Sequence, residues 1–193
     1  MKWALISVHD KSGIVDFAKE LNKQGFCVIS TGGSLTTLKE GGVSKVKHVS
    51  EITGFPEILE GRIKTVHPKI LGGILALRNN PAHIRELEQF QIEPIDLVIC
   101  NLYPFEKITK EEGATLKTAL ENIDIGGPNM IRAAAKNFEN VVVVVKPSRY
   151  MQVLEEYKKN GDVSFETRKV LAVEAFQQTS RYDSVIREFL EKT

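Results

Sequence analysis

The sequence contains few of the residues that mark secreted, metal-binding or nucleic-acid-binding proteins. Only two of its 193 residues are cysteines, and 25 aspartates and glutamates balance its 26 lysines and arginines. Two cysteines cannot build the disulfide framework of a small secreted domain, so Cys27 and Cys100 are interpreted as reduced thiols of a cytoplasmic enzyme. A net charge of +1 lacks the basic excess of a nucleic-acid-binding domain, and no nucleic-acid partner is expected.

Long apolar runs and closely spaced metal ligands are also missing. The apolar run at residues 141–145 has the length of a strand and is too short to cross a membrane, and the N-terminus lacks the pattern of a signal peptide. The cysteines are far apart, and no close pair exists among the histidines, which are His9, His48, His67 and His83. We therefore expect neither membrane association nor a bound metal.

Along the first 150 residues, segments with strand-like spacing of apolar residues alternate with helix-like segments. Strands are predicted at residues 3–8, 27–30, 43–49, 95–100 and 141–145, and helices at 14–21, 35–40, 81–90, 116–122 and 128–137. This alternation is typical of an α/β domain with a mainly parallel central sheet and helices on both faces. The unbroken apolar run at 141–145 favours a central strand, whereas residues 50–73 have no clear period and are interpreted as a functional loop.

From residue 149 onward the spacing of apolar residues is helical. A boundary is predicted near Lys146-Pro147-Ser148. We therefore divide the chain into a domain of residues 1–147 and a C-terminal helical extension of residues 148–193 that packs on it.

Polar residues gather where four of the predicted strands end. The clusters are Ser7 with His9, Asp10 and Lys11; residues 31–34; Asn101 with Tyr103; and Lys146. In open parallel sheets, ligands bind beyond the carboxyl ends of the strands. We expect these clusters to meet at one edge of the sheet and to form a binding site there.

The Thr31-Gly32-Gly33-Ser34 segment opens a predicted helix. Glycine amides at a helix N-terminus suit a phosphate group, and Lys11 would supply a countercharge. The same residues are equally typical of an ordinary glycine-rich turn with Ser34 as the N-cap, and a single lysine is more often a solvated surface residue. The residues alone leave both interpretations open.

The segment at residues 61–68 carries two cations, a hydroxyl and an imidazole. Arg62 and Lys64 would point the same way on an extended segment, which suits a shared anionic ligand. A solvated basic loop has the same composition. His67 precedes Pro68 and is expected to order the loop rather than to titrate.

A third segment, Asp124-Ile125-Gly126-Gly127-Pro128, leads into a predicted helix with proline in its first turn. Free amides at Gly126 and Gly127 could form an oxyanion hole. Asp124, taken alone, is better explained as a helix-capping carboxylate. Lys136 lies about 12 Å along the helix axis from Pro128, so its long side chain would reach the Asp124 region only in a favourable geometry.

Ordered blocks that include these segments run through most of the chain. They are ALISV at 4–8 with DKSG at 10–13, STGG at 30–33, ITGFPE at 52–57, GRIKTVHP at 61–68, CNLYPF at 100–105, NIDIGGP at 122–128 and RAAAKN at 132–137. Together they resemble the N-terminal domain of the bifunctional purine enzymes that combine AICAR transformylase with IMP cyclohydrolase. The resemblance implies a methylglyoxal-synthase-like three-layer fold, a reaction without a cofactor, a purine nucleotide as substrate and product, and a homodimer. The transformylase domain of the family would follow these residues and is absent from them.

The resemblance also implies roles for particular residues in closing the ring of 5-formamidoimidazole-4-carboxamide ribonucleotide to give IMP. Lys64 would polarise the formyl oxygen, Asp124 paired with Lys136 would orient or deprotonate the attacking amide, and Tyr103 would relay a proton. The ribose phosphate would be held by Ser7, Lys11, Thr31, Gly32, Gly33, Arg62 and Thr65. The base and the oxyanion would be bound by Asn101 and the backbone of Ile125, Gly126 and Gly127.

The chain departs from the family pattern at four positions. Leu71, Phe138 and Gln178 replace histidines that family members usually carry, and His9 replaces a more usual serine. None belongs to the implied catalytic group, but they would matter if a histidine were the acid–base residue, a role for which His67 is then the remaining loop histidine.

Two other functions fit part of the sequence. A methylglyoxal synthase shares the start of the chain and the Thr-Gly-Gly loop, but lacks the segment at 61–68 and the block at 100–105. A non-catalytic nucleotide-sensing domain needs the phosphate loop, but has no use for the four implied catalytic residues together.

Overall fold

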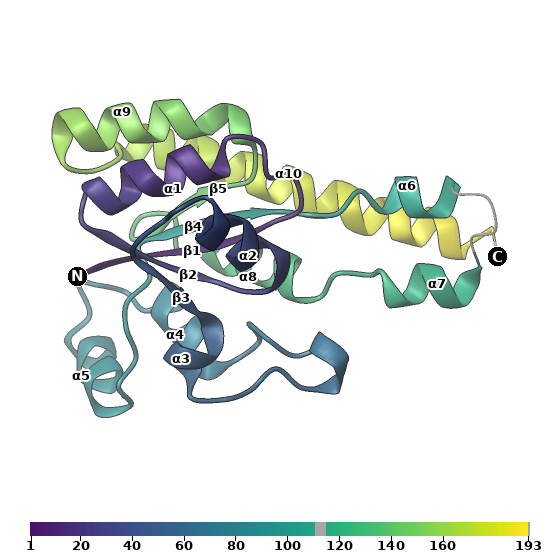
Figure 1. Cartoon of the computed structure of the whole chain (residues 1–193), viewed down its shortest axis with the longest axis horizontal. Helices are drawn as coiled ribbons and strands as arrows, with labels where there is room; N and C mark the ends of the chain where they lie inside the picture. Colours follow the sequence, from purple (N-terminus) through teal and green to yellow (C-terminus); the bar gives the residue numbers. More distant parts are fainter. Residues whose placement is uncertain (111–114, 193) are drawn as a thin grey trace.

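A five-stranded sheet lies at the centre of the computed structural model, which describes residues 1–110 and 115–192 (Figure 1). The strands are β1 (Lys2–Val8), β2 (Phe26–Ser30), β3 (Val46–His48), β4 (Leu97–Asn101) and β5 (Val142–Val144). Their order is β3-β2-β1-β4-β5, and neighbouring strands run parallel. The carboxyl ends of all five strands therefore lie at one edge of the sheet.

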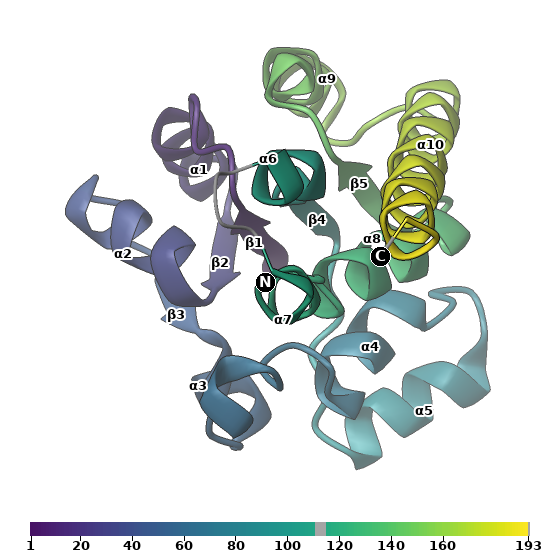
Figure 2. The ribbon, with the colours of Figure 1, turned by 90° about the vertical axis from the view of Figure 1, so that its right-hand side faces the viewer.

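Helices cover both faces of the sheet. They include α1 (Ile14–Lys23), α2 (Gly32–Glu40), α4 (Pro68–Leu75), α5 (Pro81–Gln89), α8 (Gly126–Lys136), α9 (Tyr150–Asn160), which follows the 3₁₀ turn η2 (Pro147–Arg149), and α10 (Phe165–Leu190). Figure 2 shows α1 and α9 on one face and α4 and α8 on the other. This arrangement confirms the predicted three-layer α/β class. It also explains the apolar strands, because a strand buried on both faces has no solvent-facing positions.

The residues after 148 pack directly on this sheet domain. Helix α9 contacts α1, and α10 packs against α8 and the strand β5. The division of the chain at residue 147 stays a prediction.

The predicted central position of the strand at 141–145 is wrong, because β5 is an edge strand. Its side chains are nevertheless buried, since Val142, Val143 and Val144 are at most 1% exposed. Helices α8 and α10 both contact β5. An unbroken apolar run reports burial on both faces and does not report position within the sheet.

The segment at residues 50–73 is more regular than its sequence indicates. It contains α3 (Val49–Thr53), the 3₁₀ turn η1 (Leu59–Gly61) and α4. Helix α4 begins with Pro68, the side chain of His67 accepts a hydrogen bond from Lys69 N at 3.1 Å, and Ile70 and Ile74 are buried one turn apart. The sequence did not predict this helix, because Gly72 and Gly73 lie in it and glycine has a low helix propensity.

An arm of three helices projects beyond the carboxyl edge of the sheet (Figure 1). It is built from α6 (Phe105–Lys110), which the sequence did not predict, from α7 (Leu116–Glu121) and from the second half of α10. Phe105, Ala119 and Tyr182 form its small buried core, separate from the main core. Among the residues that the structure describes, no helix combines the length and apolar character needed to cross a membrane.

Two buried tyrosines differ in what their hydroxyl groups contact. The Tyr150 ring stacks on Phe17 with a centroid distance of 4.4 Å, and its hydroxyl has no hydrogen-bond partner among the described residues. The Tyr182 hydroxyl accepts a hydrogen bond from Asp124 N at 2.8 Å. Burying an unpaired hydroxyl destabilises a fold, whereas a made hydrogen bond stabilises it.

We therefore expect Tyr150→Phe to raise the free energy of unfolding by about 1 kcal/mol and Tyr182→Phe to lower it by about 1 kcal/mol. Urea denaturation followed by circular dichroism measures both values. A lower midpoint for Tyr150→Phe would show that this hydroxyl is hydrogen-bonded in solution.

Candidate functional site

A cleft of about 750 Å³ lies at the carboxyl edge of the sheet. Four segments line it: the end of β1 with its loop, the start of α2, residues 60–66, and residues 120–130 with the first turn of α8. Its size is that of a site for a small-molecule ligand. The predicted site residues in its lining are Ser7, Lys11, Thr31, Gly32, Gly33, Arg62, Lys64, Thr65, Asp124, Ile125, Gly126 and Gly127.

Two ammonium groups approach the N-terminus of α2. A methyl group built on Gly32 would lie 3.8 Å from Lys64 Nζ, and one built on Gly33 would lie 4.0 Å from Lys11 Nζ. Gly32 has a φ of 53°, a conformation that glycine adopts without strain. The first amides of α2 and two cations thus converge in one place, which is an arrangement suited to an anion.

The alternative interpretation of this segment, with Ser34 as the N-cap, is wrong. Thr31 occupies the N-cap position with an extended backbone. The Ser34 hydroxyl instead accepts a hydrogen bond from Val8 N at 2.9 Å and donates one to Val8 O at 3.0 Å. Ser34 thereby ties the first turn of α2 to the end of β1.

The basic segment, residues 61–68, is not the extended segment on which Arg62 and Lys64 would point the same way. An antiparallel bridge joins Ile58 to Ile63, and the residues between them include Leu59, Glu60 and Gly61 with φ values of 52°, 55° and 86°. The two cations that follow Gly61 contact separate carboxylates.

Arg62 has a helical backbone and forms an exposed ion pair with Glu121 of α7, at 2.5 Å. Lys64 lies 3.5 Å from Glu57. Both cations line the cleft, but the tight turn rather than an extended strand brings them there.

Asp124 caps the start of α8. Its Oδ1 accepts a hydrogen bond from Gly127 N at 2.9 Å, so the prediction of a free amide at Gly127 is wrong and the capping interpretation of Asp124 is confirmed. A methyl group built on Gly127 would lie 2.3 Å from Asp124 Oδ2 and 2.5 Å from Leu102 Cδ2. A side chain at this position would have to displace the Asp124 carboxylate or Leu102. The same turn approaches the basic segment, because a methyl group on Gly126 would lie 2.9 Å from Thr65 Oγ1.

Three predicted site residues are not part of the cleft lining: Asn101, Tyr103 and Lys136. Asn101 orders the loop after β1, because its Oδ1 accepts hydrogen bonds from His9 N at 2.7 Å and Asp10 N at 2.8 Å, and its Nδ2 donates to Asp10 O at 3.0 Å. The implied contact of Asn101 with a base is therefore not what its amide does in this structure.

Tyr103 reaches the cleft through His9, which lines it. The two rings meet edge to face, with a centroid distance of 4.2 Å. Partial burial and the charges of Lys11 and Lys107 lower the pKa of His9, so this imidazole is neutral at pH 7. The sequence marked His9 as a polar residue after the first strand and as a departure from the family pattern, but not as a contact of Tyr103.

Lys136 is far from the residue that it was expected to pair with. It is the exposed last residue of α8, whereas Asp124 precedes the first turn of this 11-residue helix, which is about 15 Å long. No ion pair joins the two side chains in the described part of the chain. The implied Asp124–Lys136 pair is not formed within this chain, because the two residues lie at opposite ends of α8, and their pairing stays a prediction.

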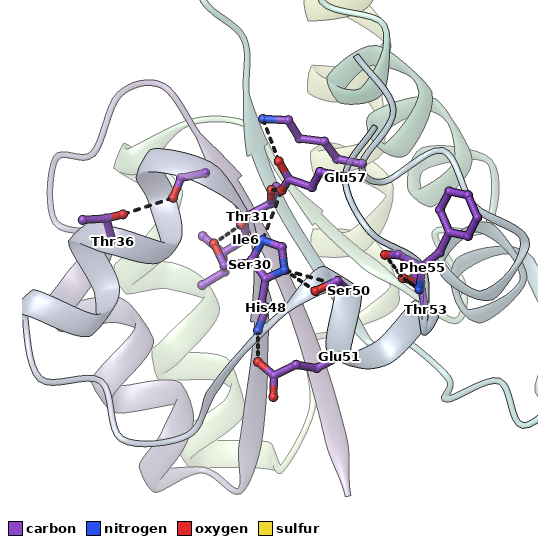
Figure 3. A network of polar contacts seen from close by, with 12 residues as sticks. Ile6, Ser30, Thr31, Thr36, His48, Ser50, Glu51, Thr53, Phe55 and Glu57 are labelled. Atoms are coloured by element: carbon purple, nitrogen blue, oxygen red, sulfur yellow. Dashed lines mark hydrogen bonds and ion pairs between the residues drawn. The ribbon is translucent and has the colours of Figure 1, made fainter. Parts of the chain in front are cut away.

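A carboxylate that the sequence did not single out contacts several of these residues (Figure 3). Glu57 accepts hydrogen bonds from the Thr31 hydroxyl and from His48, and also contacts Lys64. Nothing in the sequence around Glu57 indicates these contacts, because its partners come from three other parts of the chain.

Two protein-family models match the chain. Residues 13–129 match the family model of the MGS-like domain, and residues 134–193 match that of the AICARFT/IMPCHase bienzyme. The chain belongs to the MGS-like domain family.

The chain is also similar to individual proteins of known sequence or structure. The chain is 54% identical over its full length to the bifunctional purine biosynthesis protein PurH of Acetivibrio thermocellus, and 56% identical over 98% of its length to PurH of Thermoanaerobacter sp.. It spans 37% of the length of each of these relatives. A solved structure described as the crystal structure of ForH is 34% identical, with a TM-score of 0.87 over 98% of both chains. The predicted resemblance to the bifunctional purine enzymes is confirmed.

The close approach at Gly127 makes a stability prediction. Gly127→Ala should lower the free energy of unfolding by about 1–3 kcal/mol, because the added methyl group displaces the Asp124 carboxylate or Leu102. Gly33→Ala is the matched control, since a methyl group there would make only an ordinary contact with Lys11, at 3.9 Å from Cε, and should leave stability unchanged or raise it. Thermal unfolding followed by calorimetry compares the two, and equal midpoints would contradict the prediction.

Proposed function

We propose that the chain is an IMP cyclohydrolase, which closes the ring of 5-formamidoimidazole-4-carboxamide ribonucleotide with loss of water to give IMP, the last step of purine biosynthesis. The observation that carries the proposal is the meeting of three family segments in one cleft: the start of α2, residues 60–66, and the turn at Asp124. The names of the similar proteins, which assign PurH to purine biosynthesis, and the name of the bienzyme model give further support.

The reaction makes definite demands on such a cleft. The carboxamide nitrogen attacks the formyl carbon, the formyl oxygen becomes a hydroxyl group, and this group leaves as water after gaining a proton. An amide nitrogen is a weak nucleophile, so the site must hold both groups in attack geometry, stabilise the developing oxyanion and move protons.

In our proposal the start of α2 binds the ribose phosphate. The amides of Gly32 and Gly33 and the Lys11 ammonium lie together there, and Ser7 and Thr65 line the adjoining walls. Arg62 joins them when the phosphate displaces Glu121, since an exposed ion pair contributes little stability.

Lys64 and Asp124 act on the reacting groups in this proposal. Lys64 polarises the formyl oxygen and assists the loss of water. Asp124 orients or deprotonates the carboxamide through Oδ2, since Oδ1 is used by Gly127 N. Tyr103, which packs against His9 at the cleft, relays or positions a proton. The proposal leaves out Lys136, which lies at the other end of α8.

The substitution Lys64→Ala tests the catalytic assignment. We expect IMP formation, measured by chromatography, to fall by about 100-fold or more, while IMP still binds in calorimetric titration. Lys69→Ala is the matched control, because Lys69 is a nearby cation outside the cleft lining and its removal should leave turnover unchanged. Near-normal turnover of Lys64→Ala would overturn the assignment. Methylglyoxal formation from dihydroxyacetone phosphate by the wild-type protein would instead support a synthase.

We propose further that the protein is a cytoplasmic homodimer. Its two cysteines are unpaired, which suits a reducing compartment. Val170, Val173 and Phe176 follow one another at three-residue spacing on α10 and are each 41–51% exposed, so they form an apolar row.

Light scattering after size exclusion measures the oligomeric state. We expect the wild-type protein to be a dimer and Val173→Glu to be a monomer, because a buried carboxylate without a partner opposes association. A monomeric wild-type protein at micromolar concentration would refute the dimer.

A further inference from the structure

We propose that Glu57 is a positioning residue for the cyclohydrolase reaction, holding the Lys64 ammonium beside the N-terminus of α2. The inference deepens the proposed function and rests on it. Glu57 lies outside the cleft lining, so it acts through Lys64 and does not touch the substrate itself.

One oxygen of the Glu57 carboxylate is fixed by two donors from different elements (Figure 3). Glu57 Oε1 accepts a hydrogen bond from Thr31 Oγ1, at the N-cap of α2, and another from His48 Nε2 at 3.1 Å. The tautomer of His48 follows from its other nitrogen. Because Ser50 N–H donates to Nδ1 at 3.2 Å, Nδ1 carries no proton and Nε2 is the donor.

The second oxygen is left for the ammonium group. Lys64 Nζ lies 3.5 Å from Glu57 Oε2. The lysine side chain also passes close to Gly61, where a methyl group would lie 2.7 Å from Lys64 Cε. The carboxylate and the bare glycine backbone together define where the ammonium stands.

The charge on Glu57 persists at physiological pH. Burial alone would favour the neutral acid, but the Thr31 hydrogen bond, the charge of Lys64 and the interaction with His48 outweigh it and lower the pKa of Glu57. The carboxylate is therefore ionised wherever the enzyme is assayed near neutrality. It offers Lys64 a fixed counterion beside the N-terminus of α2.

This arrangement predicts that removing the Glu57 charge lowers kcat without weakening the binding of IMP. Glu57→Gln keeps the size of the side chain and one acceptor oxygen, but removes a negative charge from an anion-binding cleft. We expect kcat for IMP formation to fall at least tenfold, because Lys64 loses its counterion. The Kd of IMP should stay equal to the wild-type value or decrease, because repulsion of the phosphate is reduced.

Glu40→Gln is the matched control. Glu40 is an exposed carboxylate at the end of α2 and lies outside the cleft lining. We expect its kcat to stay within twofold of wild type. If Glu57→Gln keeps its kcat within twofold, or loses IMP affinity as much as turnover, the positioning role is refuted, since the second result is that of a structural residue.

A double-mutant cycle tests whether Glu57 acts through Lys64. Adding Glu57→Gln to Lys64→Ala should leave kcat unchanged, whereas a further tenfold loss would overturn the proposal. Glu57→Asp serves if the glutamine variant does not fold. Its shorter side chain should also lower kcat without weakening IMP binding, and a wild-type kcat would count against the proposal.

The nuclear magnetic resonance signal of ¹³C-methylated Lys64 is assigned with the Lys64→Arg variant. It distinguishes failure of the Glu57–Lys64 contact from failure of the proposed function. Absence of wild-type turnover would refute the proposed function. A Lys64 signal that does not respond to substitution of Glu57 would refute the contact itself, whatever the reaction.

Discussion

The register between β1 and β2, and the bonds that fix it, are the constraint on which the cleft depends. Ile6 pairs with Ser30 across the two strands, and the Ser30 hydroxyl donates to Ile6 O at 2.7 Å. One turn into α2, Ser34 bonds both backbone groups of Val8. These hydroxyl groups fix where α2 begins relative to β1, and the N-terminus of α2 lines the cleft because the helix starts at the carboxyl edge of the sheet.

Carboxylates and a carbonyl group pair with the three cations that line the cleft. Arg62 pairs with Glu121 and Lys64 with Glu57, whereas Lys11 Nζ donates to a carbonyl, His9 O, at 3.3 Å. The ion pair between Arg62 and Glu121 is exposed and contributes little stability, so an anion can displace Glu121 from Arg62 at low cost. The Glu57 carboxylate is held by Thr31 and His48 and is less free to move. Arg62 is therefore able to move with a ligand, whereas Lys64 is held in place by Glu57.

Helix α8 links the site to the C-terminal helices. The two family models that match the chain meet within it, one ending at residue 129 and the other beginning at residue 134. Its first turn is capped by Asp124 in the cleft, and the rest packs against α10. Tyr182 of α10 accepts the hydrogen bond of Asp124 N, at 2.8 Å. The C-terminal helices thus support the position of a proposed catalytic carboxylate.

The sequence by itself determined the class of fold and the approximate location of the site. Strands at residues 3–8, 27–30 and 95–100 follow from local apolar spacing, and polar residues after these strands must meet at one edge of a parallel sheet. The cap at Asp124 was likewise predictable, because capping is a contact between near neighbours in sequence. The ordered blocks then identified the family.

Only the tertiary structure decided which side chains meet. Three contacts join residues that are distant along the chain: the pairing of Arg62 with Glu121, the use of Asn101 by the loop after β1, and the hydrogen bond from Thr31 to Glu57. The edge position of β5 likewise depends on the order of the strands in the sheet. The spacing of apolar residues reports whether a position is buried, but it does not report what buries it. Contacts between side chains depend on how the helices and loops are packed in space, and the local sequence around Glu57 does not contain that information.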